Sequence, residues 1–349
     1  MRVLVAPLNW GLGHAARCVP LVNRFLAQGD EVVLGGDGES LVLLRKHFPL
    51  LRVVHLAELS LSYSSGKRQV RAMLRALPKI VRAAWADHWL LEDLLGQEDF
   101  DLVVSDNRFG LFSQKTRCVY VTHQLYIHLP RMYRWLEPLA ARIHGRVCRH
   151  YAETWVPDYE EAAKSLSGDL GHPKKSYYGT IRYIGPLSRF EDINVPMRPS
   201  IIGCFDVVAV LSGLEPQRSM LEEEIVSRYS GSEERVLIIE GKPSHPMLQV
   251  TRGNICIVPY MDDAELMVLL RKAKRIIARS GYSTIMDLAC IGALAKAELI
   301  PTPGQPEQEY LALRVEKLPQ NCTFEYKTAE FSLIICVCQK KAVSSRALS

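Results

Sequence analysis

The 349-residue sequence has no long apolar run, no metal-ligand spacing and no leader-like segment. None of its apolar runs approaches the ~20 residues that a membrane-spanning helix needs. Met1-Arg2 leads directly into the apolar run Val3–Leu8, so we expect no signal peptide. Nine cysteines are scattered without paired spacing, which favours reduced thiols in a cytoplasmic protein. These absences argue against an integral membrane protein or a disulfide-stapled domain, and they predict no metal and no cofactor.

Acidic residues are scarce in the first half of the chain. Residues 1–185 carry 24 Lys and Arg against 18 Asp and Glu, whereas residues 186–349 carry 19 against 20. The length suits two domains, and a mean hydropathy near zero is typical of globular proteins. A basic first half predicts an anionic partner there, either a membrane surface or an acidic acceptor.

Short apolar runs alternate with amphipathic segments, which predicts an α/β fold with parallel sheets. The first run leads into a GxGHxxR segment that contains Gly11, Gly13, His14 and Arg17. The two glycines allow a tight turn, and the following helix offers free N–H groups to an anion. The third glycine of a dinucleotide-binding fingerprint is missing, which disfavours a Rossmann dehydrogenase.

Polar residues follow two further predicted strands of the first half. Asp106 and Asn107 end the apolar run that starts at Asp101, and His123 ends the run that starts at Cys118. The carboxyl ends of parallel strands meet at one edge of a sheet, where open α/β folds bind ligands. We therefore expect these three residues on the same side as His14.

The stretch from Arg279 to Ala312 contains two consecutive strand ends with polar loops. Arg279-Ser280-Gly281 opens a helix that we predict over Ser283–Ile291, and Asp287 lies one or two turns into it. A Gly/Pro loop then presents Gln305 and Gln308. Such side chains can grip a polyhydroxylated, phosphorylated ligand.

These motifs resemble the MurG-like glycosyltransferases of glycosyltransferase family 28. The resemblance implies the GT-B architecture, in which two Rossmann-like domains face each other across a cleft. It divides the chain into an acceptor-side domain (1–185), a linker (186–203), a nucleotide-sugar domain (204–333) and an atypical tail (334–349). The family usually has Glu where this chain has Asp287, and of its phosphate loop only Gly213 remains.

The resemblance also implies roles for individual residues. Asp287 would bind the ribose of UDP, Met261 would lie at the uracil, and Arg189 would lie near the diphosphate. His14 would be the general base. The remaining donor-side candidates are Gly11, Gly13, Gly213, Arg279, Ser280, Gly281, Gln305 and Gln308.

The implied reaction is the inverting, metal-independent transfer of a sugar from a UDP-sugar to a hydroxyl acceptor. Lipid-linked hydroxyls are among the acceptors that the resemblance implies. No DxD-like metal site is evident, so the leaving charge would fall on loop N–H groups, helix termini and arginine. Two alternatives remain open: a UDP-sugar hydrolase or epimerase on the same fold, and a non-catalytic nucleotide-sugar-binding protein.

Two basic segments remain outside these motifs. Lys67, Arg71, Arg75, Lys79 and Arg82 form one helical stripe, beside an apolar stripe that includes Leu77 and Val81; Pro78 should kink or restart this helix. Either the basic stripe faces solvent while the apolar stripe faces the core, or the helix lies on the surface of an anionic membrane. In the second segment, 131–149, aromatics alternate with arginines, but no nucleic-acid motif is present. We therefore expect lipid or core contacts there, peripheral association at most, and no nucleic acid.

Overall fold

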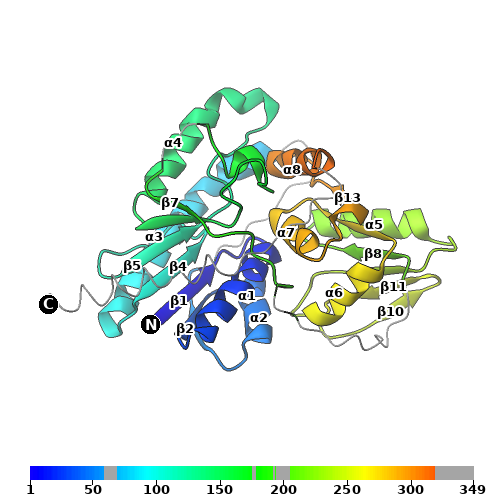
Figure 1. Ribbon diagram of the computed structural model, residues 1–349, viewed down its shortest axis with the longest axis horizontal. Helices are drawn as coiled ribbons and strands as arrows, with labels where there is room; N and C mark the ends of the chain where they lie inside the picture. Colours follow the sequence, from blue (N-terminus) through cyan, green and yellow to red (C-terminus); the bar gives the residue numbers. More distant parts are fainter. Residues whose placement is uncertain (59–68, 175–177, 192, 194–204, 319–349) are drawn as a thin grey trace.

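A computed structural model describes residues 1–58, 69–174, 178–191, 193 and 205–318 of the chain. These residues form two α/β units, each built around its own sheet (Figure 1). The first sheet has seven strands in the order β3-β2-β1-β4-β5-β6-β7, and the second has six in the order β10-β11-β9-β8-β12-β13. All pairings are parallel except that of β10 with β11, so the predicted α/β class with parallel sheets is confirmed.

The first sheet is covered by helices on both faces. Val3 and Val5 of β1 pack with α1 and α2, whereas Leu4 and Ala6 pack with α3 and α4, as the two-residue period of a strand requires. The strands are β1 (Arg2–Pro7), β2 (Glu31–Gly36), β3 (Arg52–His55), β4 (Leu102–Asp106), β5 (Arg117–Val121), β6 (Glu153–Val156) and β7 (Ile181–Tyr183). The helices are α1 (Leu12–Ala27), α2 (Gly38–His47), α3 (Gln69–Gln97) and α4 (Glu137–Cys148), with the 3-10 turns η1 (Arg131–Leu136) and η2 (Gly168–Leu170).

The second sheet is also sandwiched. Val207 and Ala209 of β8 pack against α5, whereas Val208 packs with α6 and with Leu288 of α7. The strands are β8 (Val207–Val210), β9 (Val236–Ile239), β10 (Val250–Arg252), β11 (Ile255–Val258), β12 (Arg275–Arg279) and β13 (Ala297–Ile300). The helices are α5 (Gln217–Tyr229), α6 (Asp263–Lys272), α7 (Tyr282–Cys290) and α8 (Pro306–Glu316), with the 3-10 turn η3 (Leu294–Lys296).

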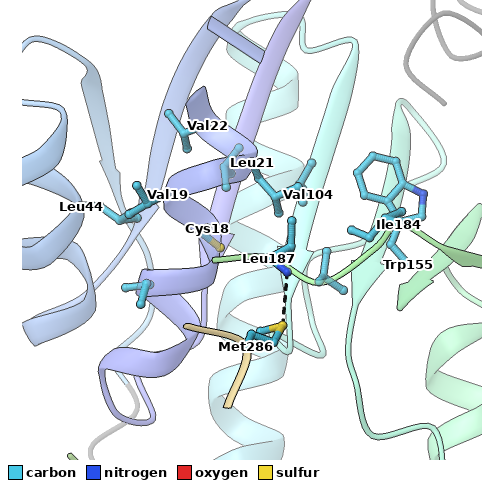
Figure 2. Close-up of a cluster of buried hydrophobic side chains, with 14 of the residues drawn as sticks. Cys18, Val19, Leu21, Val22, Leu44, Val104, Trp155, Ile184, Leu187 and Met286 are labelled. Carbon is cyan, nitrogen blue, oxygen red and sulfur yellow. Dashed lines mark hydrogen bonds between the residues drawn. The ribbon is translucent and has the colours of Figure 1, made fainter. Parts of the chain in front are cut away.

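The two domains share one apolar cluster. Ile285 and Met286 of α7 are fully buried in the cluster that contains the inner face of α1. Figure 2 shows Met286 beside Leu187 and below Cys18 of α1, and the backbone N–H of Leu187 contacts the Met286 sulfur at 3.2 Å. The junction between the domains is therefore packed like a protein interior on this side.

Several expectations about single elements need correction. The helix α3 passes through Pro78 without a restart, because a helix of 29 residues can tolerate the one backbone hydrogen bond that a proline removes. Leu77 and Val81 do not face the core: they are about half exposed. Lys67, most of the predicted linker and the predicted tail lie outside the described residues. No described helix is long and apolar enough to cross a bilayer.

Candidate active site at the domain interface

The loop after β1 brings the start of α1 into contact with the second domain. Gly11 caps α1 with a φ of 87°, a conformation that side-chain-bearing residues rarely adopt. The Gly13 carbonyl accepts a hydrogen bond from Ser283 Oγ of α7 at 2.8 Å. A Cβ at position 13 would lie 3.0 Å from that oxygen, so only glycine allows this approach without a shift.

His14 and Asp106 form a hydrogen-bonded pair at the first strand ends. His14 Nδ1 lies 2.7 Å from Asp106 Oδ1, and the Asp106 side chain is fully buried. Arg17, one turn after His14, binds both carboxylate oxygens of Asp106, with Nε donating to Oδ2 at 2.5 Å. The histidine, the aspartate and the arginine thus form one hydrogen-bonded cluster, although 89 residues separate Arg17 from Asp106 in the sequence.

The charges of this cluster determine the tautomer of His14. Burial alone would raise the pKa of Asp106, but the Arg17 guanidinium and His14 outweigh burial and lower the pKa to about 2. His14 Nδ1 faces an acceptor, the ionised carboxylate at 2.7 Å, and a donor, Arg17 Nη2 at 2.9 Å. We assign the proton to Nδ1 because the carboxylate contact is the shorter one and Nη2 already donates to Asp106. The Nε2 of His14 is then left to accept a proton from a ligand, and the His14 side chain remains 15% exposed.

Asn107 controls where its two neighbours point. It adopts a left-handed φ of 56°, and the Tyr120 hydroxyl donates to its side-chain oxygen at 3.0 Å. Asp106 therefore faces α1, whereas Arg108 reaches Asp37 and Asp87. The amide of Asn107 supports this turn and does not contact His14.

His123 connects the cluster to the second domain. Its Nδ1 lies 3.0 Å from Arg17 Nη1, and its Nε2 lies 2.7 Å from Glu307 Oε1 at the start of α8. The ring stacks on Tyr282 of α7, with centroids 4.3 Å apart and planes within 8°. A side chain predicted for the acceptor side is therefore sandwiched between two elements of the donor side.

Asp287 is buried in α7 and holds the crossover between the domains. Its Oδ1 accepts from Ser188 Oγ at 2.8 Å, and its Oδ2 accepts from Arg189 Nε at 3.0 Å. Arg189 also contacts Asp263 at 3.1 Å. Burial raises the pKa of Asp287 to about 6, against the opposing effect of Arg189. The two side chains predicted to bind ribose and diphosphate thus bind each other.

The other predicted donor-side residues lie at the ends of β12 and β13. The guanidinium of Arg279 donates to the carbonyls of Pro301 and Gln217 at 3.1 and 2.7 Å. The hydroxyl of Ser280 donates to the Gln308 carbonyl at 2.8 Å, and Gln308 Oε1 accepts from the Thr302 N–H at 2.8 Å. These contacts brace the two loops against each other. They do not leave the Arg279 side chain aimed at a ligand.

The remaining predicted residues provide helix caps, a turn and apolar packing in this structure. Gly281 and Gln305 cap the N-termini of α7 and α8. Gly213 follows β8 with a φ of 98°. Met261 is buried in the apolar cluster between β11 and α6. They follow strands of the same sheet, but no described contact links them to His14.

Two interface residues were assigned no role from the sequence. Arg17 is the last residue of the GxGHxxR motif, and Glu307 directly precedes Gln308. Each has a signal in the sequence, since it stands within a motif already singled out. Their partners lie in distant segments, so the contacts themselves leave no local pattern. Among the described residues, no group of three or more His, Cys, Asp or Glu side chains is arranged to hold a metal ion.

Comparisons with known proteins agree with this architecture. A protein of Methanosarcina acetivorans described as an uncharacterized glycosyltransferase is 23% identical, over 97% of this chain and 89% of its own length. A second such protein, from Methanosarcina mazei, is 22% identical over the same shares. The glycotransferase of kitacinnamycin matches with a TM-score of 0.55 and 12% identity, over 92% of this chain and 88% of the other. No family model matches the chain.

A fourth match has a bound ligand. The spinosyn rhamnosyltransferase SpnG complexed with thymidine diphosphate matches with a TM-score of 0.55 and 14% identity, over 89% of this chain and 84% of the other. The chain therefore has the fold of GT-B glycosyltransferases, with two Rossmann-like domains, and its curated relatives are described as glycosyltransferases. The finer placement in the MurG-like family stays a prediction.

Proposed function

We propose that this protein is a glycosyltransferase that moves a sugar from a UDP-sugar to a hydroxyl acceptor with inversion. The observation that carries the proposal is the His14–Asp106 pair at 2.7 Å, beside the first turn of α7. A histidine whose Nδ1–H is fixed by an ionised carboxylate has the geometry of a general base. The curated relatives and the GT-B fold support the same class of reaction.

His14 Nε2 would take the proton of the acceptor hydroxyl as the hydroxyl oxygen attacks the anomeric carbon of the donor sugar. The bond between that carbon and the diphosphate oxygen breaks, and the nucleoside diphosphate leaves with the electron pair. Asp106 keeps the correct tautomer and stabilises the imidazolium that forms. Its low pKa means that it remains a carboxylate at neutral pH.

The donor would lie against the N-terminus of α7. The first N–H groups of a helix have no partner within the helix, and they favour a diphosphate. The Arg279 guanidinium is already bound to two carbonyls. We therefore propose that the backbone N–H groups after Gly281 stabilise the negative charge of the leaving diphosphate. Asp287 remains our candidate for the ribose, because a carboxylate can accept more than the two bonds it has here.

An assay of UDP release tests this proposal across a panel of UDP-sugars, with and without a lipid extract as acceptor. Turnover that requires the extract supports transfer. Turnover in water alone would identify a hydrolase, and interconversion of the donor sugar would identify an epimerase. Binding of UDP without any turnover would identify a non-catalytic binding protein.

We also propose that the first domain rests on an anionic membrane surface. Trp85 and Trp89 of α3 are 60% and 65% exposed, and Trp135 of η1 is 75% exposed. Large apolar side chains recur at helical spacing on both elements, and exposed basic residues flank them. The exposed apolar side chains are Leu77, Val81, Trp85 and Trp89 on α3, and Met132, Trp135, Leu139 and Ile143 on η1 and α4.

Tryptophan beside lysine and arginine suits the boundary between lipid headgroups and acyl chains. The flanking basic residues are Lys79, Arg82, Arg131, Arg134, Arg142 and Arg146, all exposed. Such a surface would bring a lipid-linked acceptor to His14. The side chains of Arg71 and Arg75, from the predicted basic stripe, are not among those described.

A further inference from the structure

One chain of hydrogen bonds crosses the domain interface and ends at the proposed base. It starts at Glu307 Oε1 on α8, 2.7 Å from His123 Nε2. It continues from His123 Nδ1 to Arg17 Nη1 at 3.0 Å, and from Arg17 to both oxygens of Asp106. Asp106 then binds His14 at 2.7 Å.

The donors and acceptors at the Glu307 end of this chain allow only one arrangement. An arginine only donates, so His123 Nδ1 must accept from Arg17. His123 therefore has its proton on Nε2 and donates it to Glu307. Burial lowers the pKa of His123, which keeps the ring neutral. A doubly protonated ring would aim an N–H at the Arg17 guanidinium.

We propose that Glu307 and His123 are positioning residues: they hold Arg17, and through it the Asp106–His14 pair, so that the base is aligned only while α8 is docked on the first domain. The stacking of His123 on Tyr282 adds a second contact with the donor-side domain. This inference rests on the proposed function only for its kinetic consequence. The hydrogen-bonded chain can be tested without any turnover.

A rival role for Glu307 is direct contact with the donor sugar. The two roles predict different behaviour for His123, which would not touch a sugar bound by Glu307. Under the positioning role, losing either residue breaks the same chain, so the two losses should not add. Under the rival role, the Glu307 variant alone weakens binding of the UDP-sugar relative to UDP.

The kinetic test compares His123→Ala, Glu307→Ala and the double variant. We expect each single variant to lose about tenfold in kcat, with the UDP dissociation constant within twofold of the wild type, and the double variant to be no worse than the singles. Glu307→Gln keeps an acceptor oxygen and should restore most of the activity. Glu309→Ala, at an exposed position of the same helix, is the matched control. Additive losses, or a donor KM raised by Glu307→Ala alone, overturn the proposal.

The structural test uses long-range ¹H–¹⁵N spectra of the histidine rings in the full chain. We expect His123 as the neutral Nε2–H tautomer, with its signals shifted in Glu307→Ala and retained in Glu307→Gln. The His14 signals should also shift in Glu307→Ala. An Nδ1–H tautomer for His123, or His14 signals that ignore Glu307→Ala, would refute the chain even in an inactive protein. If the spectra agree but no UDP-sugar is turned over, only the proposed function fails.

Discussion

A buried arginine fixes the protonation states of the residues around it. Arg17 is nearly inaccessible to solvent, and its charge is balanced by the fully buried Asp106. A buried charge without a partner costs several kcal/mol, so neither residue can change alone without a large loss of stability. The base is therefore best tested at His14 itself, which is partly exposed and whose loss leaves the ion pair between Arg17 and Asp106 in place.

Replacing His14 with alanine should lower turnover at least a hundredfold and leave UDP affinity unchanged. The loss reflects general-base catalysis, which typically contributes ~10²–10⁴-fold. Single-turnover kinetics and calorimetry with UDP measure the two effects separately. His55→Ala, at the exposed end of β3, controls for a histidine change in the same domain. A variant that binds UDP poorly but turns over normally at saturation would make His14 a donor ligand.

Asp287→Asn should weaken UDP binding roughly tenfold or more. A charge-assisted bond from a ribose hydroxyl contributes about 1.5–3 kcal/mol, and the amide cannot provide it. Asp263→Asn is the matched control, since Asp263 also pairs with Arg189. If UDP affinity falls equally in both variants, the loss comes from the disturbed position of Arg189 and not from a lost contact between UDP and Asp287.

The same variant should change the pH dependence of stability. The pKa of Asp287 is raised to about 6, so the folded protein binds this proton more tightly than the unfolded chain. Its stabilising contribution is complete below about pH 4 and is lost as the pH rises through about 6. Urea unfolding from pH 4 to pH 7 should give Asp287→Asn a flatter profile than the wild type. Parallel profiles would show that Asp287 titrates normally.

At the scale of elements, core packing does not explain why large apolar side chains are exposed on α3 and α4. Replacing Trp85 and Trp89 with glutamine should reduce co-sedimentation with anionic vesicles severalfold, because tryptophan provides the apolar contact at the interface. Added salt should weaken binding of the wild type as well. Met247→Gln/Leu248→Gln removes two equally exposed apolar residues from the second domain and should have no effect. Wild-type protein that ignores anionic vesicles at low salt would end the membrane proposal.

The sequence predicts long elements well and short or distant features poorly. The strand ends at Asp106 and His123 follow from apolar runs of four or more residues, and both lie where the parallel pattern puts them. β7 and β10 have three residues each, too few for a period-two signal, and neither was predicted. Leu77 and Val81 have the spacing of a core stripe but are exposed, because spacing alone does not say what a helix face meets.

At the scale of the whole molecule, the tight contact between α1 and α7 sets the distance between the two domains. Gly13→Ala should lower both activity and thermal stability, because the new methyl group would lie 3.0 Å from Ser283 Oγ and push α7 away. Adding Ser283→Ala removes that oxygen and should recover much of the loss. Gly96→Ala, where a methyl group meets nothing within 4 Å, is the control. If Gly13→Ala changes neither activity nor thermal stability, the two domains are further apart in solution than in this structure.

The shared cluster of α1 and α7 also limits how this protein can be recombined with its relatives. Exchanging the donor-side half for that of another glycosyltransferase is a natural way to seek a new sugar specificity. In such a hybrid, α7 of the other protein would pack against Val19, Leu187 and their neighbours. Ile285 and Met286 of the present protein would therefore have to be retained. A single crossover in the linker would therefore not suffice, and two further crossovers, one between β12 and α7 and one between α7 and β13, would keep the recipient's α7 in the hybrid.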